Sequence, residues 1–157
     1  MVYSKKNERR LLSVVIIILA VISGVIFMTI TSRAPIVNDL VTVEINGHII
    51  RAELAQTPEE HYRGLSNREA LDPDRGLLFI FEDSSRKSFV MREMNFPLDI
   101  IFISNDTITD VFSDLVPEGS QPENIYQSSQ PVNLVLEVRA GYCQAQGIKP
   151  GDQVKIY

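Results

Sequence analysis

The feature that most constrains this chain is a run of twenty residues without a charged side chain at positions 11–30. At about 1.5 Å per residue, an α-helix of this length is about 30 Å long, which matches the hydrocarbon core of a bilayer. Four basic residues precede the run and Arg33 alone follows it closely, so the positive-inside rule predicts a cytoplasmic N-terminus. The sequence therefore predicts a single-pass membrane protein with a cytoplasmic tail, a transmembrane helix, a linker and an extracytoplasmic domain, at residues 1–10, 11–30, 31–40 and 41–157.

A cleaved secretory signal is the alternative interpretation of this N-terminal segment. The apolar centre of such a signal usually spans about 7 to 15 residues and ends at a small-x-small site. The run here is longer, and its best cleavage site, residues 32–34, is an imperfect fit followed by Pro35. The only cysteine, Cys143, lies near the C-terminus, which leaves no acylation site after the run and no disulfide within the chain. We therefore expect a retained membrane anchor.

The segment at 41–157 has the size of one domain and is acidic. It carries ten Lys and Arg against eighteen Asp and Glu, a net charge of −8. This charge disfavours nucleic acid as a partner and disfavours close contact with anionic lipid. The expected partners are the membrane, through the single N-terminal helix, and a small-molecule or cell-envelope ligand.

Short strands dominate the pattern of this domain. Apolar and polar residues alternate on both sides of Asn46-Gly47, which is the signal of a type I′ β-hairpin, and a second hairpin is predicted around Asn105-Asp106. Seven or more short strands at this spacing favour a β-sandwich or barrel over an open parallel sheet. The expected strands are 41–45, 50–54, 77–81, 87–91, 99–103, 107–112, 132–138 and a last strand ending at Ile156.

Two short helices complete the expected fold. Thr57 is placed as an N-cap, with Pro58 at the first helical position, Glu60 in position for a capping box and Gly64 at the end of the turn. One or two further helical turns are expected at 140–146. The predicted fold class is thus mainly β, a single β-sandwich or jelly-roll-like domain with one or two short helices, preceded by one transmembrane helix.

Several separate blocks of the domain resemble the domain of unknown function 192 family. The resemblance implies a compact β-sandwich of jelly-roll type with small helices, found behind a signal or anchor in prokaryotes, and it implies no activity. Three residues depart from the family's usual pattern, with Ser66 in place of Met, Val90 in place of Trp and Glu93 in place of Asn. The blocks that carry the resemblance are 53–65, Arg68, 76–81, 89–103, 135–141, 147–148 and 151–152.

A candidate ligand site is suggested where Pro97 leads into the strand at 99–103. Asp99 lies at the entrance of this strand, and loops and strand ends commonly form clefts. Asp99 is expected either to be a buried carboxylate satisfied by backbone N–H groups or an arginine, or to accept hydrogen bonds from a ligand gripped by arginines. The candidate ligand-binding residues are Arg63, Arg68, Met91, Arg92, Glu93 and Asp99.

The most favoured function is a binding module, with two alternatives left open. Asp99 could form the carboxylate pair of a cell-envelope carbohydrate hydrolase with Glu93 or Glu137, although Glu137 alternates with apolar neighbours and is expected to be an ordinary outward-facing charge. A purely structural scaffold is the second alternative.

No metal or cofactor is expected. His48 and His61 are the only histidines, and neither has a partner at ligand spacing. Cys143 is expected to be a small buried hydrophobic residue rather than a nucleophile, and Met91 and Met94 are expected to fill the core rather than to bind copper.

Overall fold

The structure is a computed structural model that describes residues 40–157. The predicted cytoplasmic tail, the transmembrane helix and residues 31–39 of the linker lie outside these residues. Within 40–157, no helix has both the length and the apolar character needed to span a bilayer. The elements, in chain order, are β1 (Val41–Ile45), β2 (His48–Ala55), α2 (Pro58–Arg63), β3 (Arg75–Ser85), β4 (Ser88–Phe89), β5 (Leu98–Ser104), β6 (Thr107–Leu115), β7 (Tyr126–Gln127), β8 (Val132–Arg139), α3 (Tyr142–Gln146) and β9 (Val154–Ile156).

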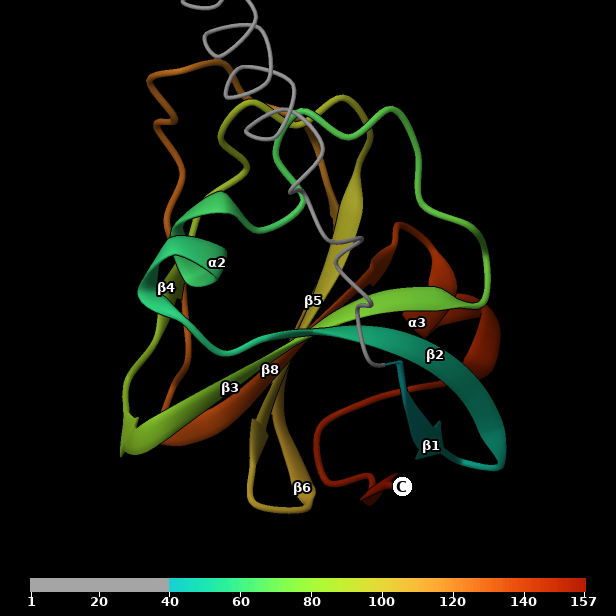
Figure 1. The fold of residues 1–157 in the computed structure, drawn as a ribbon. Coiled ribbons are helices and arrows are strands. Elements are labelled where there is room, and N and C mark those ends of the chain that lie inside the picture. Colours follow the sequence, from blue (N-terminus) through green and yellow to red (C-terminus); the bar gives the residue numbers. More distant parts are fainter. Residues whose placement is uncertain (1–39) are drawn as a thin grey trace, which may run out of the picture. The chain divides into compact units, whose positions relative to one another are not determined.

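Seven strands form one curled sheet in the order β6-β5-β8-β3-β2-β1-β9, and β4 pairs with β7 in a separate two-stranded ribbon (Figure 1). The mainly-β class with short helices is confirmed. The described strands form a half-barrel, however, rather than the two stacked sheets of a predicted sandwich. One reason is that β2 and β3 pair in parallel, which requires the crossover that carries α2 over one face of the sheet.

Local sequence signals explain both hairpins. Asn46 and Gly47 have φ angles of 53° and 81°, and positive φ at both central residues is what a type I′ turn requires. Asn105, with φ of 56°, starts the turn between β5 and β6, which pair as far as Ser104 and Thr107. Both predicted hairpins are confirmed.

The predicted capping box begins α2. The Glu60 backbone N–H donates to Thr57 Oγ1 over 3.3 Å, and the Thr57 backbone N–H donates to Glu60 Oε2 over 3.0 Å. Hydrogen bonds from the backbone of Gln56 and Thr57 lower the pKa of Glu60 below its usual value. The helix ends at Gly64, whose φ of 50° and ψ of −133° suit glycine because it has no Cβ.

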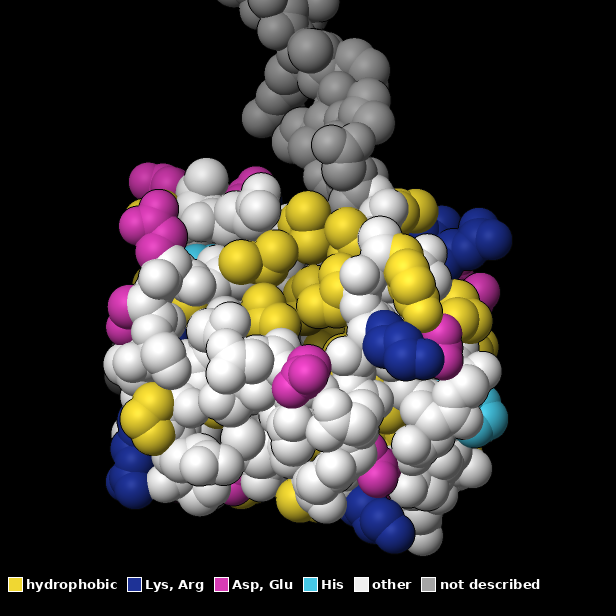
Figure 2. Space-filling model, turned by 90° about the horizontal axis from the view of Figure 1, so that it is seen from below, with side chains coloured by type: hydrophobic (Ala, Val, Ile, Leu, Met, Phe, Trp, Pro, Cys, Tyr) yellow, Lys and Arg dark blue, Asp and Glu magenta, His cyan; other side chains and the backbone are white. Residues whose placement is uncertain are grey.

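The two faces of the sheet pack into separate hydrophobic clusters. Leu78, Leu136 and Ile101 lie in register across β3, β8 and β5 and belong to one cluster. Cys143, which lies in α3, belongs to the same cluster. The next residues along, Phe79 and its partners in β8 and β5, belong to the other cluster. We name these the α3-side and α2-side clusters. In Figure 2, hydrophobic side chains gather in a hollow on one face of the domain, with charged side chains scattered around it.

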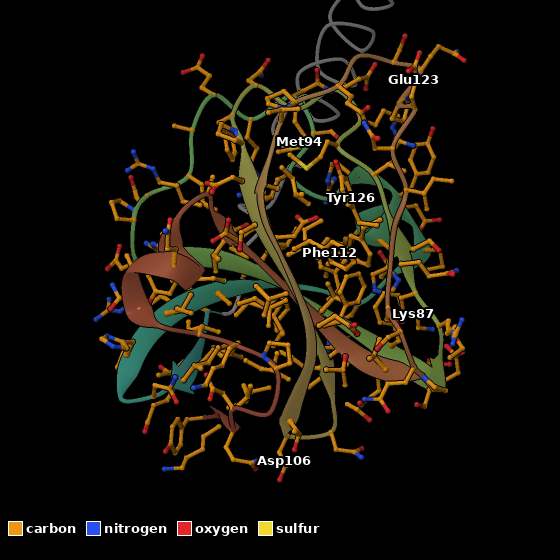
Figure 3. The ribbon with its side chains drawn as sticks, turned by 180° about the vertical axis from the view of Figure 1, so that it is seen from behind. Lys87, Met94, Asp106, Phe112, Glu123 and Tyr126 are labelled. Atoms are coloured by element: carbon orange, nitrogen blue, oxygen red, sulfur yellow. The ribbon has the colours of Figure 1, made fainter. Side chains whose placement is uncertain are left out.

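The segment that follows β3 leaves the main sheet. The strand predicted at 87–91 is reduced to Ser88–Phe89, which pairs with Tyr126–Gln127. Phe112 of β6 contacts Tyr126 of this ribbon at 5.7 Å between ring centroids, and the two side chains lie next to each other in Figure 3. The ribbon therefore covers the α2-side cluster, and this covering layer creates the site described next.

Candidate functional site

A cavity of about 260 Å³ lies between α2, the following turn, β3 and the segment that contains β4. We name it the α2 cavity. Its floor includes Glu137 of β8, and its walls combine aromatic, basic and small polar side chains. The lining residues are His61, Tyr62, Arg63, Gly64, Leu65, Ser66, Phe79, Phe81, Lys87, Ser88, Phe89, Val90, Arg92, Met94 and Glu137.

Aromatic rings brace the inner wall of the α2 cavity. Phe79 and Phe89 meet edge to face with centroids 4.9 Å apart, and Phe89 meets Phe102 in the same way at 5.7 Å. The His61 ring lies 4.5 Å from that of Phe81. Its Nε2 is 3.0 Å from the carbonyl oxygen of Ala55, and because a carbonyl only accepts, Nε2 donates this bond. The wall is therefore made of rings whose positions are fixed by packing.

Basic side chains also line the cavity. The Arg92 guanidinium lies 3.9 Å from the ring centroid of Tyr62 and donates to the Tyr62 carbonyl oxygen. The Lys87 ammonium pairs with Asp83 at 2.7 Å and lies 4.2 Å from the Phe81 centroid. Arg63 is exposed at the end of α2. Among residues 40–157, neither Arg63 nor Arg92 forms an ion pair, so two guanidinium groups remain available for an anion.

Glu137 is the most unusual residue of the cavity. In the sheet it is paired with Leu77 on one side and Ile100 on the other, and it is only 5 % exposed. Within the described part of the chain its Oε2 is buried and has no hydrogen-bond partner. Desolvation raises its pKa from 4.5 to about 8, against the opposing effect of Arg68. Burial therefore favours the neutral form of this carboxyl, which can donate as well as accept a hydrogen bond.

The expectation that Glu137 is an outward-facing charge is wrong. It does alternate with the apolar residues Leu136 and Val138, and its side chain does lie on the opposite face of the sheet. That face is not in solvent, however, because α2 and the β4 segment cover it. A strand with both faces covered buries its acidic residue as well as its apolar ones.

Arg68 lies behind the floor of the cavity and pairs with Glu53. Its two terminal nitrogens donate to the two carboxylate oxygens over 2.7 and 2.9 Å. This pairing raises the pKa of Arg68. Glu53, Leu77 and Glu137 follow one another across β2, β3 and β8, which places the ion pair beside the neutral acid. Arg68 is thus the counter-charge of Glu53 and, unlike Arg63 and Arg92, does not line the α2 cavity.

Asp99 is held as a structural carboxylate. It is fully buried, its Oδ1 accepts from the backbone N–H groups of Asp114 at 2.9 Å and Gly141 at 3.1 Å, and its Oδ2 accepts from that of Cys143 at 2.8 Å. The interpretation of Asp99 as a carboxylate satisfied by backbone N–H groups is confirmed. Burial, followed by the nearby Asp99 charge, raises the pKa of the Cys143 thiol, which fits the buried hydrophobic role expected for that cysteine.

The structure brings only part of the predicted site together. Of the six candidates, Arg63 and Arg92 line the α2 cavity, whereas Asp99 is paired with Val138 and projects from the α3-side face. Met91 is buried in the α2-side cluster. Glu93 has a φ of 52°, a left-handed conformation that Asn adopts more readily than Glu. This conformation gives a backbone reason for the family's usual Asn at position 93.

Sequence reasoning missed the residues that define the cavity. His61, Lys87 and the phenylalanines come from segments far apart in the chain and have no common motif. Glu137 did carry a signal, because it is the one charge within the apolar run 134–138. Among residues 40–157, no three His, Cys, Asp or Glu side chains are grouped so that they could hold a metal ion.

Comparison with known families identifies the domain. The family DUF192, described as Uncharacterized ACR, matches residues 41–156. The chain belongs to this family. Ser66 and Val90, two of the departures noted for the resemblance, line the α2 cavity.

Solved structures of similar proteins agree with this assignment. A protein from Sinorhizobium meliloti 1021, named provisionally as a transcription regulator, is 31% identical with a TM-score of 0.72, and the match covers 78% of this chain and 98% of that one. A protein of unknown function from Novosphingobium aromaticivorans DSM 12444 is 34% identical with a TM-score of 0.68, covering 78% and 89%. No curated protein matches the chain. The match spans almost the whole of the first of these chains, so residues 38–157 are expected to fold on their own.

Proposed function

We propose that this protein is a membrane-tethered binding module whose DUF192 domain takes a small, negatively charged ligand into the α2 cavity. The observation that carries the proposal is the buried Oε2 of Glu137, which has no partner among the described residues and lies at the floor of a cavity. A buried polar atom without a hydrogen bond costs about 1–3 kcal/mol. A ligand that supplies the missing bond recovers this free energy.

The negative charge proposed for the ligand follows from the basic side chains of the cavity. The domain as a whole has a net charge of −8, yet three of its ten basic residues, Arg63, Lys87 and Arg92, line this one cavity. Arg63 and Arg92 form no ion pair within the described part of the chain. A guanidinium group presents a fork of donors that matches a carboxylate or phosphate, so an anionic group on the ligand is favoured at the arginine side.

The geometry disfavours the alternative of a carbohydrate hydrolase. Asp99 is paired with Val138, so their side chains project from the same face of the sheet. Glu137 precedes Val138 in the strand, and its carboxyl group therefore projects from the opposite face. The two carboxyl groups cannot flank one bond of a substrate. Glu93 does not line the cavity either. A role in DNA binding, as the provisional name of the S. meliloti relative would imply, is disfavoured by the acidic charge of the domain.

The membrane tether is supported by the sequence of residues 11–30 and by the basic residues before it. We propose that it holds the domain on the outer side of the membrane. Alkaline carbonate washing of membrane vesicles tests the tether. The full chain is expected to stay in the pellet, and a chain that lacks residues 1–33 is the control that is released. Release of the full chain would contradict the proposal.

Binding to the α2 cavity is tested with benzoate, a small ring that carries one carboxylate. Ligand-observed NMR on residues 38–157 is expected to show benzoate binding, and Val90→Trp is expected to abolish it by filling the cavity. Val116→Trp is the matched control, because Val116 is 62% exposed and does not line the cavity. Equal binding of benzoate by the Val90→Trp variant and the unaltered domain would contradict the proposed function.

A further inference from the structure

We propose that the ligand of the α2 cavity is a sugar acid, that is, a single hydroxylated ring that carries one carboxylate. This inference rests on the proposed function and names its ligand class. Three parts of the cavity contribute to it, namely the arginine side, the aromatic wall and the carboxyl group at the floor.

The arginine side accommodates the carboxylate. Arg92 is held in place by its stacking on Tyr62, with 3.9 Å between the guanidinium carbon and the ring centroid. Its backbone carbonyl accepts a hydrogen bond from Ser66 over 2.8 Å, so both ends of the residue are fixed. Arg63 follows Tyr62 directly in the chain and also lines the cavity. A guanidinium group that is already positioned loses little side-chain entropy when a carboxylate binds.

The aromatic wall and the volume of the cavity fit one ring. The cavity of about 260 Å³ lies below the range of about 300–1,000 Å³ that is usual for drug-sized ligands. Phe79, Phe81 and the His61 ring present apolar surfaces to it. Such surfaces pack against the C–H face of a sugar ring as well as against an aromatic ring, so the wall alone does not distinguish the two.

The floor of the cavity favours a hydroxylated ring over an unsubstituted one. A neutral carboxyl has both a donor and an acceptor, and a ligand hydroxyl can satisfy both. An unsubstituted apolar ring would leave Oε2 of Glu137 unpaired and buried, whereas a hydroxylated ring would not. Gly64 lies beside the carboxyl, since a Cβ at this position would be in ordinary contact with Oε2 at 3.9 Å. The hydroxyl groups of Ser66 and Ser88 add further polar contacts within the same cavity.

Three probes separate these contributions in calorimetric titrations of residues 38–157 at pH 7. D-galacturonate has both the hydroxylated ring and the carboxylate, D-galactose lacks the carboxylate, and benzoate lacks the hydroxyl groups. We expect D-galacturonate to bind at least about tenfold more tightly than either of the others, since one buried hydrogen bond is typically worth about a tenfold change in affinity. Equal or tighter binding of benzoate would overturn the assignment of a sugar acid.

Two substitutions at Glu137 test the role of the floor. Glu137→Gln keeps a donor and an acceptor in the same place and is expected to keep the preference for D-galacturonate over benzoate. Glu137→Leu removes both and is expected to abolish the preference while benzoate still binds, which also shows that the variant is folded. A preference that survives in Glu137→Leu overturns the inference and leaves the proposed function standing. Failure of all three probes with the unaltered domain overturns both.

Two sources could supply this chemistry, namely a free sugar acid or the end of an acidic polysaccharide. Trigalacturonate distinguishes them. Tighter binding than that of the monomer supports the chain end, and equal binding supports the free sugar acid. Loss of binding with both overturns the inference.

Discussion

Replacing Glu137 by Gln is expected to stabilise the domain at neutral and alkaline pH. Burial raises the pKa of this carboxyl from 4.5 to about 8, so the folded state holds the proton more tightly than the unfolded state does. The stability that depends on this proton is fully present below about pH 4.5 and is lost as the pH rises through about 8. Glutamine has nearly the same shape and carries no charge at any pH.

The magnitude follows from the difference between the two pKa values. At pH 7 the unfolded carboxyl is ionised and the folded one is protonated, so folding must take up a proton at a cost of about 3 kcal/mol. Above pH 8 the cost approaches the full difference, about 5 kcal/mol. The charged groups around Glu137 include the Arg68–Glu53 pair, and Arg63, Lys87 and Arg92 line the same cavity. The effect of Arg68 opposes the shift and is already included in the value of about 8.

Urea denaturation of residues 38–157 at pH 5, 7 and 9 measures this effect. The free energies of unfolding of the unaltered and Glu137→Gln domains are expected to agree within about 1 kcal/mol at pH 5 and to differ by about 3 and about 5 kcal/mol at pH 7 and 9. Glu69→Gln is the control, because Glu69 is exposed. The same pH dependence for the unaltered and Glu137→Gln domains would show that the carboxyl is ionised in the fold and would refute the reasoning.

Three further substitutions test the remaining structure by urea denaturation. Asp99→Asn is expected to destabilise the domain by about 3 kcal/mol, because the amide N–H₂ takes the place of one carboxylate oxygen and cannot accept from the backbone N–H that faced it; a change below about 1 kcal/mol would contradict this role. Glu93→Asn is expected to stabilise it by up to about 1 kcal/mol by relieving the left-handed backbone at φ of 52°, and a clear loss of stability would contradict the argument. Thr57→Ala is expected to cost about 1 kcal/mol through loss of the capping bond to Glu60, whereas Pro58→Ala, which leaves the cap intact, serves as its control.

Features set by neighbouring residues could be predicted from the sequence. The Asn46-Gly47 turn needs two residues that tolerate positive φ, and the sequence places them between two alternating runs. The capping box at Thr57 and Glu60 is equally local. In both cases the atoms that interact are within four residues of one another, so the sequence contains the whole signal.

Features set by pairing between distant strands could not be predicted in the same way. The parallel pairing of β2 with β3 has no local signature, yet it places α2 over the sheet and buries Glu137. Asp99 and Glu137 lie on opposite faces because β5 and β8 pair Asp99 with Val138, and a shift of one residue would reverse this outcome. Arg68 pairs with Glu53, which lies in register with Leu77 and Glu137 and not with Asp99. The candidate arginines Arg63 and Arg92 were therefore identified, whereas the burial of Glu137 beside them was not.

The protonation of Glu137 in solution is the most direct test of the account, since the selectivity proposed for the α2 cavity depends on the carboxyl at its floor. A pH titration of its side-chain ¹³C carboxyl resonance in residues 38–157 measures this. We expect a midpoint near pH 8 in the free domain and a higher midpoint in the presence of saturating D-galacturonate. A midpoint near pH 4.5, unchanged by the sugar acid, would contradict the account.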